Sequence, residues 1–173
     1  MAGELGGGAA VGLADAPLCR VATLPASSYT RPARHRDVFD RPDLVERLLH
    51  TEGEVTTVAA PAGYGKTTLL CDWADVDERP FAWVTLDHRD NDPARFEASV
   101  GLAVERVEPQ RGTGRFVLVL DDLQALHAPA AQAALAALLV GLPEEVTLAL
   151  ASRRPPALPI ARMRAQRLSL IHI

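Results

Sequence analysis

Apolar residues gather in short runs along the chain, and polar or charged residues separate these runs. The runs are compact and rich in apolar residues, which predicts strands at residues 54–60, 81–86, 116–120, 146–151 and 168–173. The segments between them predict helices at residues 66–76, 93–107, 128–140 and 160–166. A further helix is expected over residues 41–50, ahead of the first strand.

Several helix ends carry characteristic residues. Asp92 followed by Pro93 predicts an N-cap and a first helical position, and Gly141 predicts a helix end. Asp40 is the expected N-cap of the first helix, with Pro42 in its first turn. These residues agree with the elements that the apolar runs predict.

Strands and helices thus alternate, and the strands are almost continuously apolar. This pattern predicts an α/β fold, a three-layer α/β/α sandwich with a mainly parallel five-stranded sheet, in which ligands bind beyond the carboxyl ends of the strands. The 173 residues are enough for one such domain. We expect it to span residues 38–173 and to be truncated at its C-terminus, and we expect residues 1–37 to be a mostly disordered tail.

The segment between the first strand and its helix has the spacing of a phosphate-binding loop. Residues 60–68 have the sequence Ala-Pro-Ala-Gly-Tyr-Gly-Lys-Thr-Thr. In such a loop, backbone N–H groups and a helix N-terminus surround the phosphates, and Lys66 neutralises the β- and γ-oxygens. Thr67 has the hydroxyl that would bind Mg²⁺. Ala60 stands where the first glycine is expected, which is tolerable if its φ is negative.

The expected nucleotide-binding residues of this loop are consecutive. They are Ala62, Gly63, Tyr64, Gly65, Lys66, Thr67 and Thr68. An aromatic residue in a loop is also commonly packed or solvated, and Thr68 has packing or capping as its alternative role. The alternative for the whole segment is a glycine-rich turn whose lysine is merely solvated.

A second group of polar residues follows the third predicted strand. Asp121 and Asp122 stand at its carboxyl end, where Asp121 would hold Mg²⁺ opposite Thr67 and Asp122 would polarise an attacking water. An ordinary pair of aspartates that caps the next element is the alternative.

Arg153 follows the fourth predicted strand. Its guanidinium could contact the γ-phosphate and stabilise developing charge, or report whether that phosphate is present. The alternative is a surface arginine, and the neighbouring Arg154 is expected to be solvated. Together, Asp122 and Arg153 are the predicted catalytic residues.

Composition narrows the possible functions. The formal net charge is −4 and the pI is about 5.7, so the chain has no overall basic footprint for nucleic acid. Cys19 and Cys71 form neither a metal-binding spacing nor a disulfide framework, which fits a reducing, cytoplasmic compartment. No secretory signal is found, and the apolar residues 130–142 are too few to span a bilayer.

With these segments in view, the chain resembles the nucleotide-binding domain of the large ATP-binding LuxR-type, maltose-activator-like transcriptional regulators, which are signal-transduction ATPases with numerous domains. The resemblance covers residues 38–168. The segments that carry it are residues 39–44, 59–70, 82–87, 90–96, 117–122, 151–153 and 155–162.

The resemblance implies an ATP-dependent switch that uses Mg²⁺, binds ATP and ADP, and self-associates in its active state until slow hydrolysis resets it. It places Arg41 near the adenine, although a plain helix entry explains Arg41 equally well. Members of the group bind DNA through a C-terminal domain, so we expect any DNA binding to occur only through that domain, which we expect to be absent from these 173 residues. A nucleotide-binding interaction module without turnover, a small-molecule kinase and a non-functional fragment are the other possible functions.

Overall fold

The structure is a computed structural model, and part of the chain is described in it. The described residues are 29–33, 41–50, 55–107, 114–155 and 168–172, the last of these as backbone alone.

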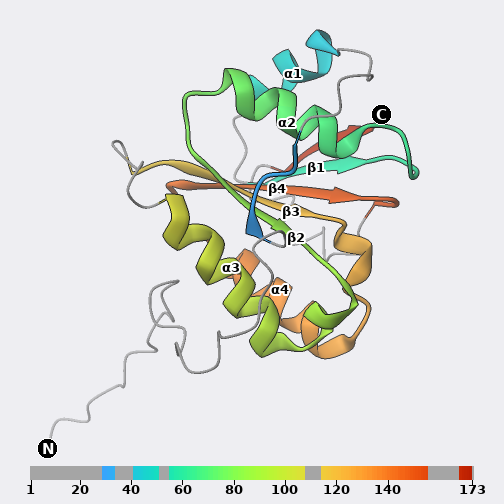
Figure 1. The fold of residues 1–173 in the computed structure, drawn as a ribbon, viewed down its shortest axis with the longest axis vertical. Helices are drawn as coiled ribbons and strands as arrows, with labels where there is room; N and C mark the ends of the chain where they lie inside the picture. The colour runs from blue at the N-terminus through green and yellow to red at the C-terminus, as the bar shows by residue number, and fades with distance from the viewer. Residues whose placement is uncertain (1–28, 34–40, 51–54, 108–113, 156–167, 173) are drawn as a thin grey trace, which may run out of the picture.

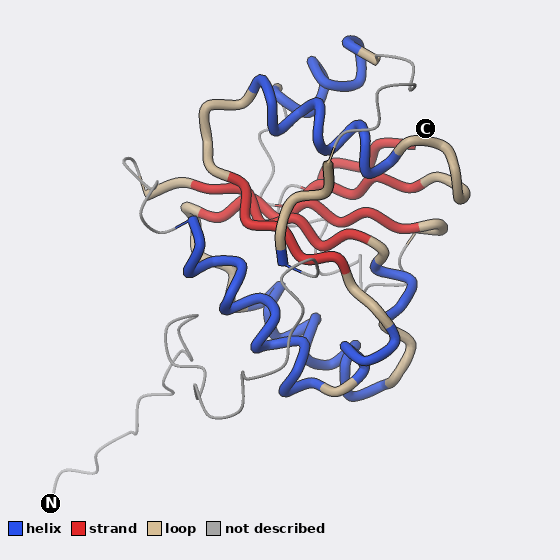
Figure 2. The backbone as a smooth tube through the Cα atoms, in the orientation of Figure 1, coloured by secondary structure: helices blue, strands red, loops and turns tan. Residues whose placement is uncertain are grey.

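Four α-helices of the described residues cover the two faces of a central sheet (Figure 1). They are α1 (Pro42–Leu49), α2 (Lys66–Val76), α3 (Pro93–Val107) and α4 (Pro129–Val140). Helices α1 and α2 lie on one face, and α3 and α4 lie on the other, so that the domain has three layers (Figure 2).

The described strands form one five-stranded sheet in the order β2-β3-β4-β1-β5. Their bounds are β1 (Val55–Ala59), β2 (Phe81–Thr85), β3 (Phe116–Asp121), β4 (Val146–Ser152) and β5 (Leu168–His172). Every strand pairing is parallel, so the carboxyl ends of all the strands meet at one edge. The predicted α/β fold with a parallel sheet is confirmed.

Strand β3 shows why the strands are continuously apolar. Successive side chains of a strand point to opposite faces of the sheet. Phe116, Leu118 and Leu120 pack under α3 and α4, whereas Val117 and Val119 pack under α1 and α2. All of them are buried, because each face of a central parallel strand is covered by helices.

Two tryptophans fill the core between α2 and the sheet. Trp73 of α2 and Trp83 of β2 are 0% and 1% exposed. The ring of Trp73 meets Phe81 edge to face, with 5.1 Å between ring centroids. Helix α2 is therefore held firmly on the sheet, with its N-terminus at the carboxyl edge of β1.

Helix ends agree with the sequence except at α1. Pro93 begins α3, and the carboxylate of Asp92 accepts a hydrogen bond from the N–H of Ala94, as expected of an N-cap. Gly141 ends α4. The N-cap of α1 is Arg41 and not the predicted Asp40, which lies outside the described residues.

Two short elements were not predicted, and one predicted helix is not covered by the structure. The chain forms two short 3₁₀ helices that the apolar pattern did not predict, η2 (His88–Asn91) and η4 (Leu123–Ala125). The predicted helix at residues 160–166 lies outside the described residues.

The segment at residues 29–33 lies against the domain, although the sequence assigned it to a mostly disordered tail. Arg31 bridges to Asp75 at 2.6 Å and donates to the carbonyl of Cys71, both on α2. The guanidinium of Arg106 on α3 lies 4.8 Å from the ring centre of Tyr29. These five residues thus contact helices on both faces of the sheet.

Candidate functional site

The loop between β1 and α2 is shaped by two glycines in left-handed backbone conformations. Gly63 has a φ of 83° and Gly65, the N-cap of α2, has a φ of 78°. Ala60 stands at the position of the usual first glycine and has no positive φ. Its methyl group is therefore tolerated there, as the sequence required. Its N–H donates to the carbonyl of Ser152 at the end of β4, which fixes the start of the loop.

Lys66 points back into this loop. Its ammonium donates to the carbonyls of Ala60 and Pro61, at 2.9 and 3.1 Å, and the residue is only 7% exposed. Burying an ammonium is costly unless its charge is compensated, and these two partners are neutral carbonyls. A buried cation at the N-terminus of α2 favours an anionic ligand at this position.

Thr67 and Asp121 meet at the same edge of the sheet. The hydroxyl of Thr67 donates to Oδ2 of Asp121 at 2.6 Å, and the N–H of Asp122 donates to Oδ1 at 2.8 Å. Burial raises the pKa of Asp121, and the negative charge of Asp122 acts in the same direction. The two hydrogen bonds and the positive charge of Lys66 lower this pKa, but they do not cancel the effect of burial. The site therefore holds a buried carboxylate beside a hydroxyl.

Those two side chains fit Mg²⁺ by their chemistry, because this ion prefers hard oxygen ligands and is commonly held by one or two protein oxygens together with substrate phosphates. Within the described residues, no group of three or more His, Cys, Asp or Glu side chains could hold a metal ion by itself. The two side chains therefore fit an Mg²⁺ ion that is bound jointly by the protein and by substrate phosphates, and not a metal site built from protein ligands alone.

Gln124, which the sequence did not mark as a site residue, links the carboxylate of Asp122 to the backbone of Arg153. Asp122 has a left-handed backbone, with φ 56°, and its Oδ1 accepts a 2.6 Å hydrogen bond from Nε2 of Gln124. The Oε1 atom of Gln124 accepts the N–H of Arg153 at 3.0 Å. The side chain of Arg153 is exposed. The position of Gln124, two residues after the paired acids at the end of β3, is the sequence feature that could have indicated this role.

The other predicted residues are placed less centrally. Ala62, Gly63 and Tyr64 are exposed at the tip of the loop, and Thr68 is half-buried in the first turn of α2. Arg41 is half-buried at the start of α1, and within the described residues no hydrogen bond or ion pair joins its side chain to the loop. The structure thus brings together Lys66, Thr67, Asp121 and Asp122, and it leaves Arg41 apart from them. Arg154 is exposed, as expected.

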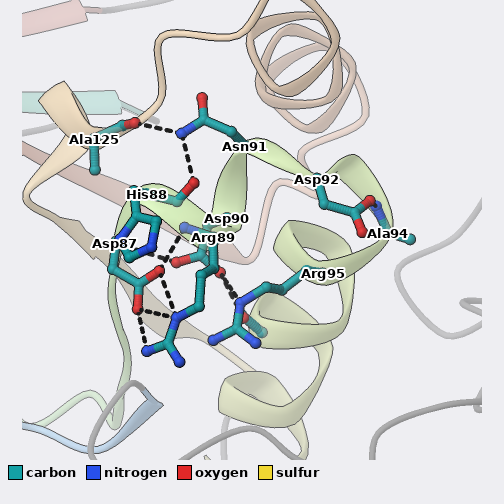
Figure 3. A network of polar contacts seen from close by, with 10 residues as sticks. Asp87, His88, Arg89, Asp90, Asn91, Asp92, Ala94, Arg95 and Ala125 are labelled. Atoms are coloured by element: carbon teal, nitrogen blue, oxygen red, sulfur yellow. Dashed lines mark hydrogen bonds and ion pairs between the residues drawn. The ribbon is translucent and has the colours of Figure 1, made fainter.

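The segment after β2 forms a dense polar network (Figure 3). Asp90, which is 1% exposed, accepts the N–H of Asp87 and completes a capping box on η2. Its other carboxylate oxygen accepts the hydroxyl of Ser99 at 3.2 Å and pairs with Arg95 at 3.3 Å. Asp90 therefore ties η2 to the first turns of α3.

Asn91 in the same segment connects two loops at the carboxyl edge of the sheet. Its Nδ2 donates to the carbonyl of Ala125 at 2.8 Å (Figure 3), and its Oδ1 accepts the N–H groups of His127 and Ala128. The residue thus fixes the segment that follows Asp122. A lone asparagine between two aspartates gave no sequence signal for this role.

Fold and site together define a parallel α/β protein whose buried lysine, hydroxyl and carboxylates gather at the carboxyl edge of the sheet. No protein-family model matches the chain. It is 29% identical over 170 residues to the HTH-type transcriptional regulator MalT of Yersinia enterocolitica, a match that covers 81% of this chain and 19% of that protein.

Two further relatives carry the same name. The HTH-type transcriptional regulator MalT of Vibrio cholerae is 28% identical over 174 residues, which is 83% of this chain and 19% of that protein. The corresponding protein of Yersinia pestis is 28% identical over 170 residues, 81% of this chain and 19% of the relative. This chain therefore resembles a minor part of a longer regulator. In the portion of the chain that the structure describes, no helix has the length and apolarity needed to cross a membrane.

Proposed function

We propose that the chain is the ATP-binding switch domain of a transcriptional regulator. The observation that carries this proposal is the hydrogen bond between Thr67 and Asp121 at the carboxyl edge of the sheet, beside the buried ammonium of Lys66. A hydroxyl and a carboxylate for Mg²⁺ and a cation for the β- and γ-phosphates are the groups that nucleoside triphosphate binding requires.

Each residue has a distinct task in this proposal. The N–H groups from Ala62 to Thr68 surround the phosphates, and Lys66 compensates their charge. Thr67 and Asp121 hold Mg²⁺, which when bound neutralises charge on the β- and γ-phosphates. Asp122 orients and polarises the attacking water, and Arg153 contacts the terminal phosphate.

The regulatory part of the proposal rests on the resemblance to MalT regulators, which covers 81% of this chain. ATP would favour an active, self-associating state, and slow hydrolysis would reset it. DNA binding would belong to other parts of such a regulator, because nothing in the net charge of −4 favours it in this chain.

A labelling experiment tests nucleotide binding directly, because Lys66 is the only lysine in the sequence. An ATP derivative with an acyl group on its terminal phosphate transfers that group to a nearby amine. Mass spectrometry should find the acyl group on Lys66, and excess ATP with Mg²⁺ should prevent its transfer. The amino terminus of the chain is the internal control, since ATP should not protect it. Labelling of Lys66 that ATP does not reduce contradicts the proposal.

A further inference from the structure

We propose that Gln124 is a positioning residue that couples the carboxylate of Asp122 to the end of β4, where Arg153 begins the next segment. This inference rests on the proposed function, in which Asp122 orients the attacking water. It assigns a role to a residue between the two predicted catalytic positions, on the loop that follows β3.

The two hydrogen bonds of Gln124 determine the orientation of its amide. The carboxylate of Asp122 can only accept, so the group that faces it at 2.6 Å is the NH₂. The backbone N–H of Arg153 can only donate, so the group that faces it at 3.0 Å is the oxygen. A side chain in this place must donate at one atom and accept at the other, and the glutamine amide meets both requirements.

The backbone around Asp122 makes this support necessary. Its left-handed conformation, unusual for a residue with a side chain, turns the chain into η4 and carries Gln124 back beneath the carboxylate. Asp122 itself is half-buried. Within the described contacts, the amide of Gln124 is the side-chain donor that holds its carboxylate.

The hydrogen bond with the backbone N–H of Arg153 connects Gln124 to the end of β4. Strand β4 lies between β1, which leads into the phosphate-binding loop, and β3, which leads into the two acids. Gln124 spans 29 positions of sequence to reach the N–H of Arg153. Movement of the segment at Arg153, as when its side chain engages a terminal phosphate, is thereby transmitted to Asp122.

Two variants of Gln124 and one control variant test the two contacts. Gln124→Met has a similar length but neither donates nor accepts in the same way. Gln124→Glu keeps the acceptor for Arg153 and replaces the donor to Asp122 with a like charge. Gln132→Met, at an exposed position of α4 where the amide makes one long contact of 3.5 Å with the carbonyl of Leu126 and none with Asp122 or Arg153, is the matched control.

Turnover of Mg-ATP by the full chain is measured for each variant, and also for Gln124→Met combined with Asp122→Asn. Gln124→Met should lower kcat about tenfold with little change in KM, the scale of one hydrogen bond to a charged group. Gln124→Glu should lower kcat at least as much. In the Asp122→Asn background, Gln124→Met should have little further effect, because it acts through that carboxylate. An unchanged kcat, or fully additive losses, overturns the inference. A parent protein that fails to bind ATP contradicts the proposed function instead.

A second measurement does not depend on turnover. Exchange of the Arg153 backbone amide with solvent is followed by NMR in the nucleotide-free protein. Asp122→Ala should accelerate this exchange several-fold, because Gln124 loses one of the two groups that fix it. Gln124→Met should accelerate it as well, and Gln132→Met should not. Equal exchange in the parent and in Asp122→Ala contradicts the coupling, whether or not the protein hydrolyses ATP.

Discussion

The hydroxyl of Thr67 donates a 2.6 Å hydrogen bond to Oδ2 of Asp121, although the two residues lie 54 positions apart in the sequence. Thr67 stands in the first turn of α2 and Asp121 ends β3, and strand β4 lies between β1 and β3 in the sheet. Only a parallel order that brings both strand ends to one edge allows this contact. The pair provides the two protein oxygens that the account assigns to Mg²⁺.

Replacing Thr67 with valine should make ATP binding depend less on Mg²⁺. Valine has the same shape but no hydroxyl, so the ion would lose one of the two protein ligands that we propose for it. We expect the affinity for Mg-ATP to fall on the order of tenfold, while the weak affinity measured in EDTA stays unchanged. Calorimetric titrations with and without Mg²⁺ measure both values. A parent protein that binds ATP equally well in EDTA would argue against the assignment of Thr67 and Asp121 to the ion.

Asp121→Asn should stabilise the nucleotide-free protein at neutral pH while weakening the binding of Mg-ATP. Burial raises the pKa of Asp121 above its ordinary value of 3.8, so the folded protein retains this proton in a pH range where the unfolded chain has lost it. The unfolding free energy is therefore larger at low pH, and it falls as the pH rises through the raised pKa of Asp121. Asparagine does not ionise, so the variant avoids this fall in unfolding free energy at neutral pH. A stabilisation of about 1 kcal/mol would raise the melting midpoint by roughly 2–4 °C.

The pH dependence provides the control for this prediction. The gain in midpoint from Asp121→Asn should shrink as the pH is lowered toward the ordinary carboxyl value, where the parent side chain is also neutral. Glu97→Gln, at an exposed carboxylate on α3, should show no comparable trend. A gain that stays constant with pH means that burial of the Asp121 charge is not its cause.

Much of this arrangement could be predicted from the sequence, for a physical reason. The apolar runs and the turn residues between them predict parallel strands, and parallel strands place Lys66, Thr67 and Asp121 at one edge whatever the detailed packing is. Local sequence patterns thus predict the fold and the proximity of these three residues.

The side-chain amides that join separate loops could not be predicted in the same way. Gln124 reaches Arg153 across 29 positions, and Asn91 reaches Ala128 across 37. Their partners are backbone groups, which any residue possesses, so no residue type at the far end marks the contact. The contact of Arg31 with Asp75 was missed because the composition of the N-terminal segment favours disorder.

Asp122→Asn should preserve ATP binding and slow ATP hydrolysis. An asparagine of the same shape keeps the fold of the turn but cannot accept a proton from water. The loss in kcat should be on the order of 10²-fold or more, as for removal of a general base. Single-turnover hydrolysis of labelled ATP measures it, with calorimetry as the check on binding. Hydrolysis at the parent rate would remove Asp122 from this role.

Arg153→Ala should reduce the preference for ATP over ADP. We assign its guanidinium to an oxygen that only the triphosphate offers, so ADP affinity should be preserved while ATP affinity falls. Competition titrations with both nucleotides measure the ratio, and Arg154→Ala, at the exposed neighbouring residue, is the matched control. Equal weakening of ATP and ADP would show that Arg153 does not sense the terminal phosphate.

The most direct test of the account is a calorimetric titration of Mg-ATP into the parent protein and the Lys66→Ala variant. Lys66 is the buried cation of the loop, held by the carbonyls of Ala60 and Pro61. Arg115→Ala, which removes an exposed cation just before β3, is the control, and circular dichroism establishes that each variant is folded. We expect the parent and Arg115→Ala to bind alike and Lys66→Ala to lose more than about tenfold in affinity. Unchanged affinity in a folded Lys66→Ala protein would contradict the account.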